Sequence, residues 1–187
     1  ISALHKSVRG SDPNAAVYWL CRMLAAGEDR LYLLRRMIRM SMEDIGLADP
    51  NAVRLAIACR DAFHFLGIPE GDIALVELAV YLAVAPKSNS LEKAQNLAMA
   101  DIRDGLNPPV PLHLRNAPTK LMRDLGYSKG YKYAHDYEGH IVEQQNLPDV
   151  LAGHQYYTPS NEGVEERIAK RLDSIRDTLN KRKNQPE

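Results

Sequence analysis

The stretch 69-PEGDIALVELAVYLAVAPK-87 decides the fold, because it is apolar on nearly every side from Ile73 to Val84. A helix of that kind is normally the buried centre of a helical bundle. Strand-like alternation of apolar and polar residues is scarce in the rest of the chain. The sequence therefore predicts an all-α fold in which this helix lies at the centre of the core.

Further helical segments lie on both sides of this stretch. Residues 11–27, 28–46 and 48–67 precede it, residues 88–105 follow it, and each segment ends at a glycine. Apolar residues recur at helical spacing in the first two segments, and the predicted stripes are Val17, Leu20, Cys21 and Leu24, and then Leu31, Leu34, Ile38 and Ile45. The short connections predict a bundle of about five roughly antiparallel helices.

The character of the chain changes after Gly105. Four prolines forbid a continuous helix there, namely Pro108, Pro109, Pro111 and Pro118. A last amphipathic helix follows, with an apolar face made by Val164, Ile168, Leu172, Ile175 and Leu179. We therefore expect one structural domain with a bundle core at 1–106, a Pro/Tyr-rich irregular segment packed on it at 107–160, and a C-terminal helix and tail at 161–187.

Composition and charge exclude some classes of protein. The chain has 187 residues, of which 45% are apolar and 26% charged, as in ordinary globular proteins. Lys and Arg together number 24, and so do Asp and Glu. The formal net charge is therefore zero, which excludes a basic surface over the whole chain, so any nucleic-acid site must be a local patch.

Neither the cysteines nor the chain ends carry a recognisable functional motif. Cys21 and Cys59 are far apart and form no CxxC motif, so we expect both to be small core residues in a reducing compartment. No apolar run approaches the roughly 20 residues that a membrane span needs, and no signal peptide is visible. The sequence begins with Ile1 rather than Met, so we expect it to be part of a longer protein.

Motifs for catalysis are nearly absent. The sequence contains no GxxxxGK[ST], GxGxxG, GxSxG or HExxH. The dipeptide His135–Asp136 is typical of metal-dependent phosphohydrolases, but that chemistry needs further His and Asp ligands from other helices, and His64 and Asp61 could supply only some of them. A structural or surface role for His135 is the interpretation that we favour.

The neighbouring carboxylates Glu43 and Asp44 are a second candidate for catalysis. Adjacent residues on a helix point about 100° apart, so these two do not face each other as an acid/base pair would. We expect them instead to pair with arginines such as Arg36 or Arg39 across a helix junction.

The run 109-PVPLHLRNAPTKLMRDLGYSKGYKYAHDY-137 combines basic residues with tyrosines. Cations beside flat rings suit single-stranded nucleic acid, but tyrosines also fix irregular segments onto a core. We expect Tyr131, Tyr133 and Tyr137 to pack inward and Lys129 and Lys132 to point outward. The candidate DNA or subunit-interface patch is Arg115, Lys120, Arg123, Lys129, Tyr131, Lys132 and Tyr133.

Five blocks of sequence, in order, carry a resemblance to a known family. They are ISALHKSVRGSDPNAAVYWLCRMLAAGED, RRMIRMSMEDIGLADPNA, YLAVAPKSNS, VPLHLRNAPTKLMRDLGYSKGYKYAHDY and YYTPSNEGVEERI. Together they resemble the C-terminal region of the replication-associated recombination protein A family (RarA/MgsA and Werner-helicase-interacting protein). These proteins are AAA+ ATPases related to clamp loaders. The resemblance extends from Ile1 to about Ile175.

The resemblance implies a non-catalytic module of a DNA-dependent ATPase that acts in replication, recombination and repair at stalled forks. In the family, ATP and Mg²⁺ bind in a preceding AAA+ core, so no catalytic, cofactor-binding or metal-binding residue is carried over to this chain. The family's C-terminal region forms tetramers, which implies a homo-oligomer. Single-stranded or forked DNA and single-strand-binding protein are the implied partners, and a nucleoid-associated location in the bacterial cytoplasm is the implied compartment.

Two other functions stay open at this point. The chain could be a helical metal-dependent phosphohydrolase that uses His135 and Asp136, or a monomeric scaffold that binds a partner protein. Besides the Pro/Tyr-rich run, the candidate interface elements are the Arg-rich segment from Arg35 to Arg39 and the final amphipathic helix.

Overall fold

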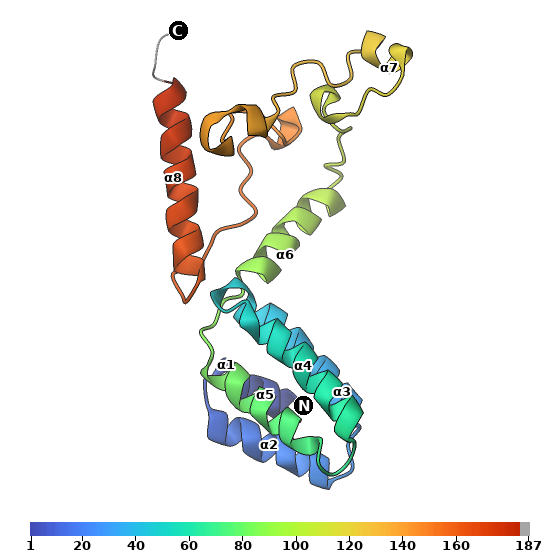
Figure 1. Ribbon diagram of the computed structural model, residues 1–187, viewed down its shortest axis with the longest axis vertical. Coiled ribbons are helices and arrows are strands. Elements are labelled where there is room, and N and C mark those ends of the chain that lie inside the picture. The colour runs from blue at the N-terminus through green and yellow to red at the C-terminus, as the bar shows by residue number, and fades with distance from the viewer. Residues whose placement is uncertain (184–187) are drawn as a thin grey trace. The chain divides into compact units, whose positions relative to one another are not determined.

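The structure is a computed structural model that describes residues 1–183. Within this range there is no strand, and the predicted all-α class is confirmed. The α-helices are α1 (Ser2–Arg9), α2 (Pro13–Ala25), α3 (Arg30–Met40), α4 (Asn51–Leu66), α5 (Asp72–Val84), α6 (Ser90–Arg103), α7 (Lys120–Asp124) and α8 (Glu165–Lys183) (Figure 1). None of the helices in the described range is both long and apolar enough to cross a membrane.

The chain divides into two compact units. Unit 1 comprises residues 1–95 and 157–169, and unit 2 comprises residues 96–156 together with the chain from Lys170 onward. This division differs from the expected segments 1–106, 107–160 and 161–187. The reason is that α6 and α8 each begin in unit 1 and end in unit 2.

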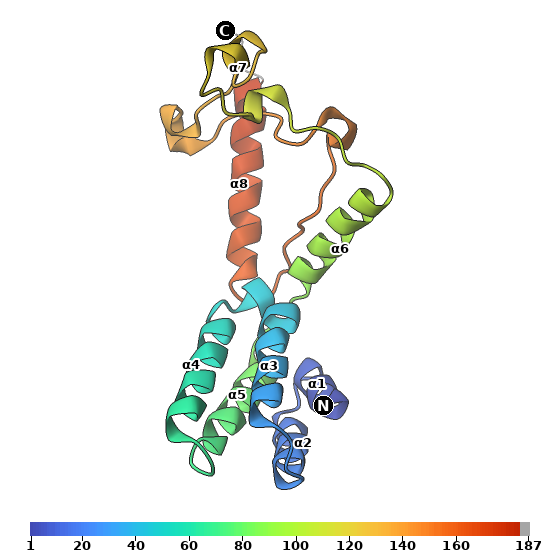
Figure 2. The ribbon, with the colours of Figure 1, turned by 90° about the vertical axis from the view of Figure 1, so that its right-hand side faces the viewer.

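Unit 1 is a bundle of α1–α5 in which α5 packs against each of the other four helices. Figure 2 shows α5 between α4 and α2. Leu75, Leu78 and Leu82 on α5 are fully buried, so the central position predicted for this helix is confirmed. Its burial on all sides was a wrong expectation, because Ile73 and Val84 are 67% and 63% exposed. The neighbouring helices leave one face of α5 uncovered.

The core of unit 1 follows the predicted periodicity with local shifts. On α3 the buried residues include Leu33 and Met37, whereas Leu31 is 42% exposed, so the stripe is rotated from the predicted one. Methionines take part in this core, and the pattern based on Leu and Ile alone overlooked them. Cys59 is buried as expected, and burial raises the pKa of its thiol. The expectation for Cys21 was wrong, because α2 turns this residue to solvent while Leu20 faces the core.

Unit 2 contains residues 107–156 of the predicted irregular segment, whereas residues 157–160 belong to unit 1. Apart from α7 and the ends of α6 and α8, its regular elements are the single 3₁₀ turns Leu112–Leu114, Ala134–Asp136, Glu138–His140 and Asp149–Leu151. Among the described residues of unit 2, only Leu151 is buried. Side-chain hydrogen bonds hold the segment instead. For example, Arg182 donates to the carbonyl oxygens of Glu138, at 2.9 Å, and of Ile141.

Candidate functional site

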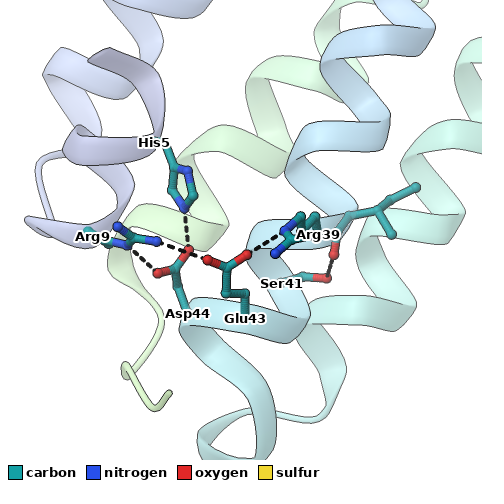
Figure 3. Close-up of polar contacts among 7 residues, drawn as sticks. His5, Arg9, Arg39, Ser41, Glu43 and Asp44 are labelled. Carbon is teal, nitrogen blue, oxygen red and sulfur yellow. Dashed lines mark hydrogen bonds and ion pairs between the residues drawn. The ribbon is translucent and has the colours of Figure 1, made fainter. Parts of the chain in front are cut away.

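A cluster of charged side chains forms where α3 widens into the π-helical turn Ser41–Ile45 (Figure 3). The turn ends at Gly46, whose φ of 52° lies in the region that favours glycine. It directs Glu43 and Asp44 toward α1 and α3. Arg9 Nε on α1 lies 2.5 Å from Asp44 Oδ1, and His5 Nε2 lies 2.6 Å from Asp44 Oδ2.

Glu43 completes this cluster. It accepts from Arg39 Nε at 2.5 Å and from Arg9 Nη2 at 3.1 Å. The predicted pairing with Arg39 is therefore confirmed. Arg36 is not among these partners, and its buried Nε lacks a hydrogen-bond partner in the described part of the chain.

Sequence reasoning missed Arg9 and His5, which come from a different helix and lie more than 30 residues away along the chain. The hydrogen bond to Asp44 raises the pKa of Arg9. Both carboxylates have basic partners on neighbouring helices, so the cluster fastens α1 to the end of α3. It offers no free acid/base pair for catalysis.

A cavity of about 440 Å³ adjoins this cluster. Its cationic lining residues are Arg9, Lys87 and Lys93, and hydroxyl-bearing residues also line it. Lys87 Nζ donates to the carbonyl oxygen of Ala83 at 2.9 Å and to that of Ala85 at 2.5 Å, and burial lowers its pKa. Asp44 pairs with Arg9, whereas the carbonyl oxygens that accept from Lys87 are neutral and do not cancel its charge.

A fully buried carboxylate, Glu165, lies at the start of α8. It accepts hydrogen bonds from Ser160 Oγ at 2.7 Å, from Tyr157 Oη at 2.8 Å and from Ser90 Oγ. Burial alone would raise the pKa of Glu165, but the hydroxyl donors, Ser88 included, outweigh burial and lower it to about 2.

The groups that donate to Glu165 are hydroxyls, and they are neutral. Burial and the bond to Glu165 raise the pKa of Tyr157 to about 12. This chemistry ties residues 157–169 to the rest of unit 1. No sequence signal could have found it, because Ser90 lies 75 residues away from Glu165 and an acidic residue at a helix start is commonplace.

Gly163 supports the same attachment. The adjacent Val164 N–H donates to the carbonyl oxygen of Ala48 at 2.8 Å. The backbone at Gly163 has φ +53°, and a Cβ there would collide with that carbonyl oxygen. Glycine is therefore required where residues 157–169 approach unit 1.

His135 and Asp136 do not lie in a metal-ligand cluster. The His135 ring lies 5.0 Å from the Tyr133 ring and 4.8 Å from the His140 ring, measured between centroids. The candidate additional ligands His64 and Asp61 belong to the other unit. Over residues 1–183, no three His, Cys, Asp or Glu side chains gather as a metal ion would need. The geometry gives the phosphohydrolase interpretation no support.

The cationic members of the predicted patch lie in unit 2 and mostly bind its own backbone. Arg115 lies over the Tyr127 ring at 5.1 Å and donates to the carbonyl oxygen of Val110 at 2.7 Å. Lys132 Nζ donates to the carbonyl oxygen of Glu143 at 3.2 Å. Arg123 Nη1 donates to the carbonyl oxygen of Ala117 at 3.3 Å. The remaining cations, Lys120 and Lys129, are exposed.

The expected inward packing of the tyrosines is wrong. Tyr131 is 49% exposed, Tyr133 54% and Tyr137 38%. The physical reason is that the described residues of unit 2 form no apolar layer on which these rings could pack. A role for this patch toward DNA or another subunit stays a prediction.

Comparison with known proteins identifies the family. The family model described as "MgsA AAA+ ATPase C terminal" matches residues 10–176. Replication-associated recombination protein A of Coxiella burnetii is 49% identical over 94% of this chain, and that of Escherichia coli K12 is 48% identical over 92%. ATPase WRNIP1 of Dictyostelium discoideum is 50% identical over 84% of the chain.

The chain is much shorter than these relatives. It spans about 40% of the Coxiella burnetii protein, 39% of the Escherichia coli protein and 18% of the Dictyostelium discoideum protein. The family model and the identities confirm the resemblance found in the sequence. The chain belongs to the MgsA family of AAA+ ATPases, as a part of their C-terminal region without the catalytic core.

Proposed function

We propose that this chain is the tetramerisation module of a DNA-dependent AAA+ ATPase that acts in replication, recombination and repair at stalled forks. ATP and Mg²⁺ are bound by a core outside this chain, and DNA and single-strand-binding protein are partners of the whole protein in the bacterial cytoplasm. The module holds several ATPase cores around one DNA structure, so that weak contacts of each core gain from linkage.

The observation that carries this proposal is the apolar surface that the single chain leaves uncovered. Ile73, Val80 and Val84 form an exposed stripe on α5, beside a shallow groove of about 400 Å³ that Val76 and Tyr81 also line. Single exposed apolar residues are normal, but a contiguous row on one helix marks an interaction surface.

Unit 2 adds a second apolar surface. Its large exposed apolar residues include Val110, Leu121, Leu125 and Val150, each more than half exposed. A closed symmetric assembly would cover such surfaces on every copy. It would also supply unit 2 with the apolar contacts that one chain lacks.

Light scattering during size-exclusion chromatography at micromolar concentration tests the proposal. We expect a mass four times the 21.0 kDa of the chain. The variants Ile73→Glu/Val84→Glu and Leu121→Glu/Leu125→Glu test the two surfaces, and at least one of them should lower the mass without loss of helical circular dichroism. Leu31→Glu, at an exposed apolar position outside both surfaces, is the control. A monomeric wild-type chain would favour the alternative of a monomeric scaffold.

A further inference from the structure

The cavity of about 440 Å³ beside the charged cluster lies entirely within unit 1. Its wall comes from four parts of the chain: Arg9 at the end of α1, Asp44 in the π-helical turn, residues of 87–93 at the junction of α5 and α6, and residues 158–160. The packing of unit 1 therefore brings distant segments together around one space. Its volume falls in the range of sites that bind small molecules, about 300–1,000 Å³.

Two of the three cations in this wall carry charge that no carboxylate takes up. Arg9 pairs with Asp44, which is the one acidic residue among the described residues that line the cavity. Lys87 and Lys93 form no ion pair within residues 1–183. The wall therefore has an excess of positive charge, which favours an anionic ligand.

Lys87 is the cation that such a ligand would stabilise most. Its Nζ donates to the carbonyl oxygens of Ala83 and Ala85, which uses two of its three N–H groups and leaves its charge in place. The side chain is partly buried, and burial outweighs the attraction of Asp44 and lowers the pKa of Lys87. Because a buried charge is costly unless it is paired, an anion in the cavity would offset part of this cost.

The hydroxyl groups of the wall suit a different part of a ligand. Ser90 Oγ and Ser160 Oγ donate their protons to Glu165, which is fully buried. With their protons engaged, these two oxygens can only accept hydrogen bonds, so they suit hydroxyl donors on a ligand. The described lining contains no aromatic residue, so it offers no ring on which a base could stack.

From this arrangement we infer that the cavity binds a small hydroxylated phosphomonoester, of the sugar-phosphate class. Its phosphate lies against Lys87 and Lys93, and its sugar hydroxyls donate to Ser90 and Ser160. A phosphomonoester carries about 1.5 to 2 negative charges at neutral pH, which matches two unpaired lysines better than a single carboxylate does. The inference goes beyond the proposed function, because a cavity within one chain requires neither assembly nor DNA.

Isothermal titration calorimetry of the whole chain with ribose 5-phosphate tests the site. We expect one ligand per chain and no binding of ribose, which lacks the phosphate. Asn89→Asp is the decisive variant, because it adds a negative charge to the wall at an exposed position just before α6, where Asp caps a helix as well as Asn does. It should weaken binding about tenfold. Asn14→Asp adds the same charge at the start of α2, and this control should bind as wild type.

Two lysine variants test the cations. Lys93→Gln, at an exposed position, should weaken binding about threefold, and Lys6→Gln at an exposed position of α1 is its control. Lys87→Met should weaken binding at least about tenfold. Because Lys87→Met also removes hydrogen bonds at the end of α5, the melting temperature of every variant is measured as well. Should Lys87→Met unfold, Asn89→Asp still decides the question.

Two thymidine oligonucleotides distinguish the sources of the phosphomonoester. If ribose 5-phosphate binds and a 5′-phosphorylated strand binds more tightly than its 5′-hydroxyl form, the site also accepts the end of a nucleic acid. If the two strands bind equally, a free sugar phosphate is the source. Either result supports the site.

Three results would overturn the inference. They are no heat from ribose 5-phosphate at millimolar concentration, equal weakening by Asn89→Asp and Asn14→Asp, and an affinity for inorganic phosphate equal to that for ribose 5-phosphate. None of them changes the mass measured by light scattering, so the proposed function is tested separately.

Discussion

In unit 1, Leu20, Leu34 and Leu78 are withdrawn from solvent, whereas in unit 2 Leu121 and Val150 are each more than half exposed. The two units therefore rely on different interactions. Burial of apolar side chains, which contributes about 1.5–3 kcal/mol for each large one, stabilises unit 1. Unit 2 depends on hydrogen bonds, whose net contribution is only about 0.5–1.5 kcal/mol each.

This difference follows from the backbone. A continuous helix satisfies its own N–H and C=O groups, so its side chains are free to form an apolar face. The prolines from Pro108 to Pro118 prevent such a helix, and backbone groups of unit 2 are bonded by side chains instead, such as Gln144 Oε1, which accepts from the Lys132 N–H at 2.7 Å. We expect unit 2 to open at lower free energy than unit 1 and to gain more from assembly.

The largest effect that separates the units is expected from truncating a buried leucine. Leu78→Ala removes a fully buried side chain from α5 and should lower the free energy of unfolding by about 2–5 kcal/mol. Leu121→Ala, at a position that is 68% exposed, is the counterpart in unit 2 and should cost about 0.5 kcal/mol or less.

Urea unfolding followed by circular dichroism, at two protein concentrations, measures both variants. If Leu121→Ala lowered the free energy of unfolding as much as Leu78→Ala only at the higher protein concentration, Leu121 would be buried by assembly. Equal costs at both concentrations would contradict the contrast between the units.

A smaller effect is expected from acid. The folded-state pKa of Glu165, about 2, lies below the ordinary value of 4.5. The contribution of ionised Glu165 to the free energy of unfolding is therefore complete above pH 4.5, and it is lost as the pH falls from about 4.5 to about 2. A shift of this size corresponds to about 3 kcal/mol. Glu165→Gln should remove that part of the acid sensitivity, measured as unfolding free energy from pH 7 to pH 2.

Asp101 provides the matched comparison in unit 2. It accepts from Tyr156 Oη at 2.7 Å and from His154 Nδ1 at 2.8 Å, and these hydrogen bonds lower its pKa. Because it is partly exposed, solvent screens these contacts, and Asp101→Asn should change the acid profile less than Glu165→Gln. The reverse order of effects would argue against the buried attachment of residues 157–169.

The features of unit 1 that could be predicted from the sequence are those set by local periodicity. The all-α class and the central position of α5 follow from apolar spacing. The exposure of Ile73 does not, because it depends on which sides the other helices leave open. The Arg39–Glu43 pair lies within one turn and was predictable, whereas the Arg9–Asp44 pair joins residues brought together only by the packing of α1.

The tyrosines show where such reasoning failed. The alternation of Tyr131 and Tyr133 with lysines predicts one inward and one outward face. An inward face requires a core beneath it, and pattern alone does not reveal whether a core is present.

The smallest expected effect concerns Tyr133, for which the sequence predicts inward packing. At 54% exposure, its ring packs beside His135 rather than in a core. Tyr133→Ala should therefore change the unfolding free energy by about 0.5 kcal/mol or less, as for other surface substitutions. Lys129→Ala/Lys132→Ala, at neighbouring exposed positions, provides the comparison and should change it equally little. Thermal unfolding of the dissociated chain measures both. A marked fall in the melting temperature for Tyr133→Ala alone would mean that unit 2 buries this ring after all, and the contrast with unit 1 would then be smaller than the exposures indicate.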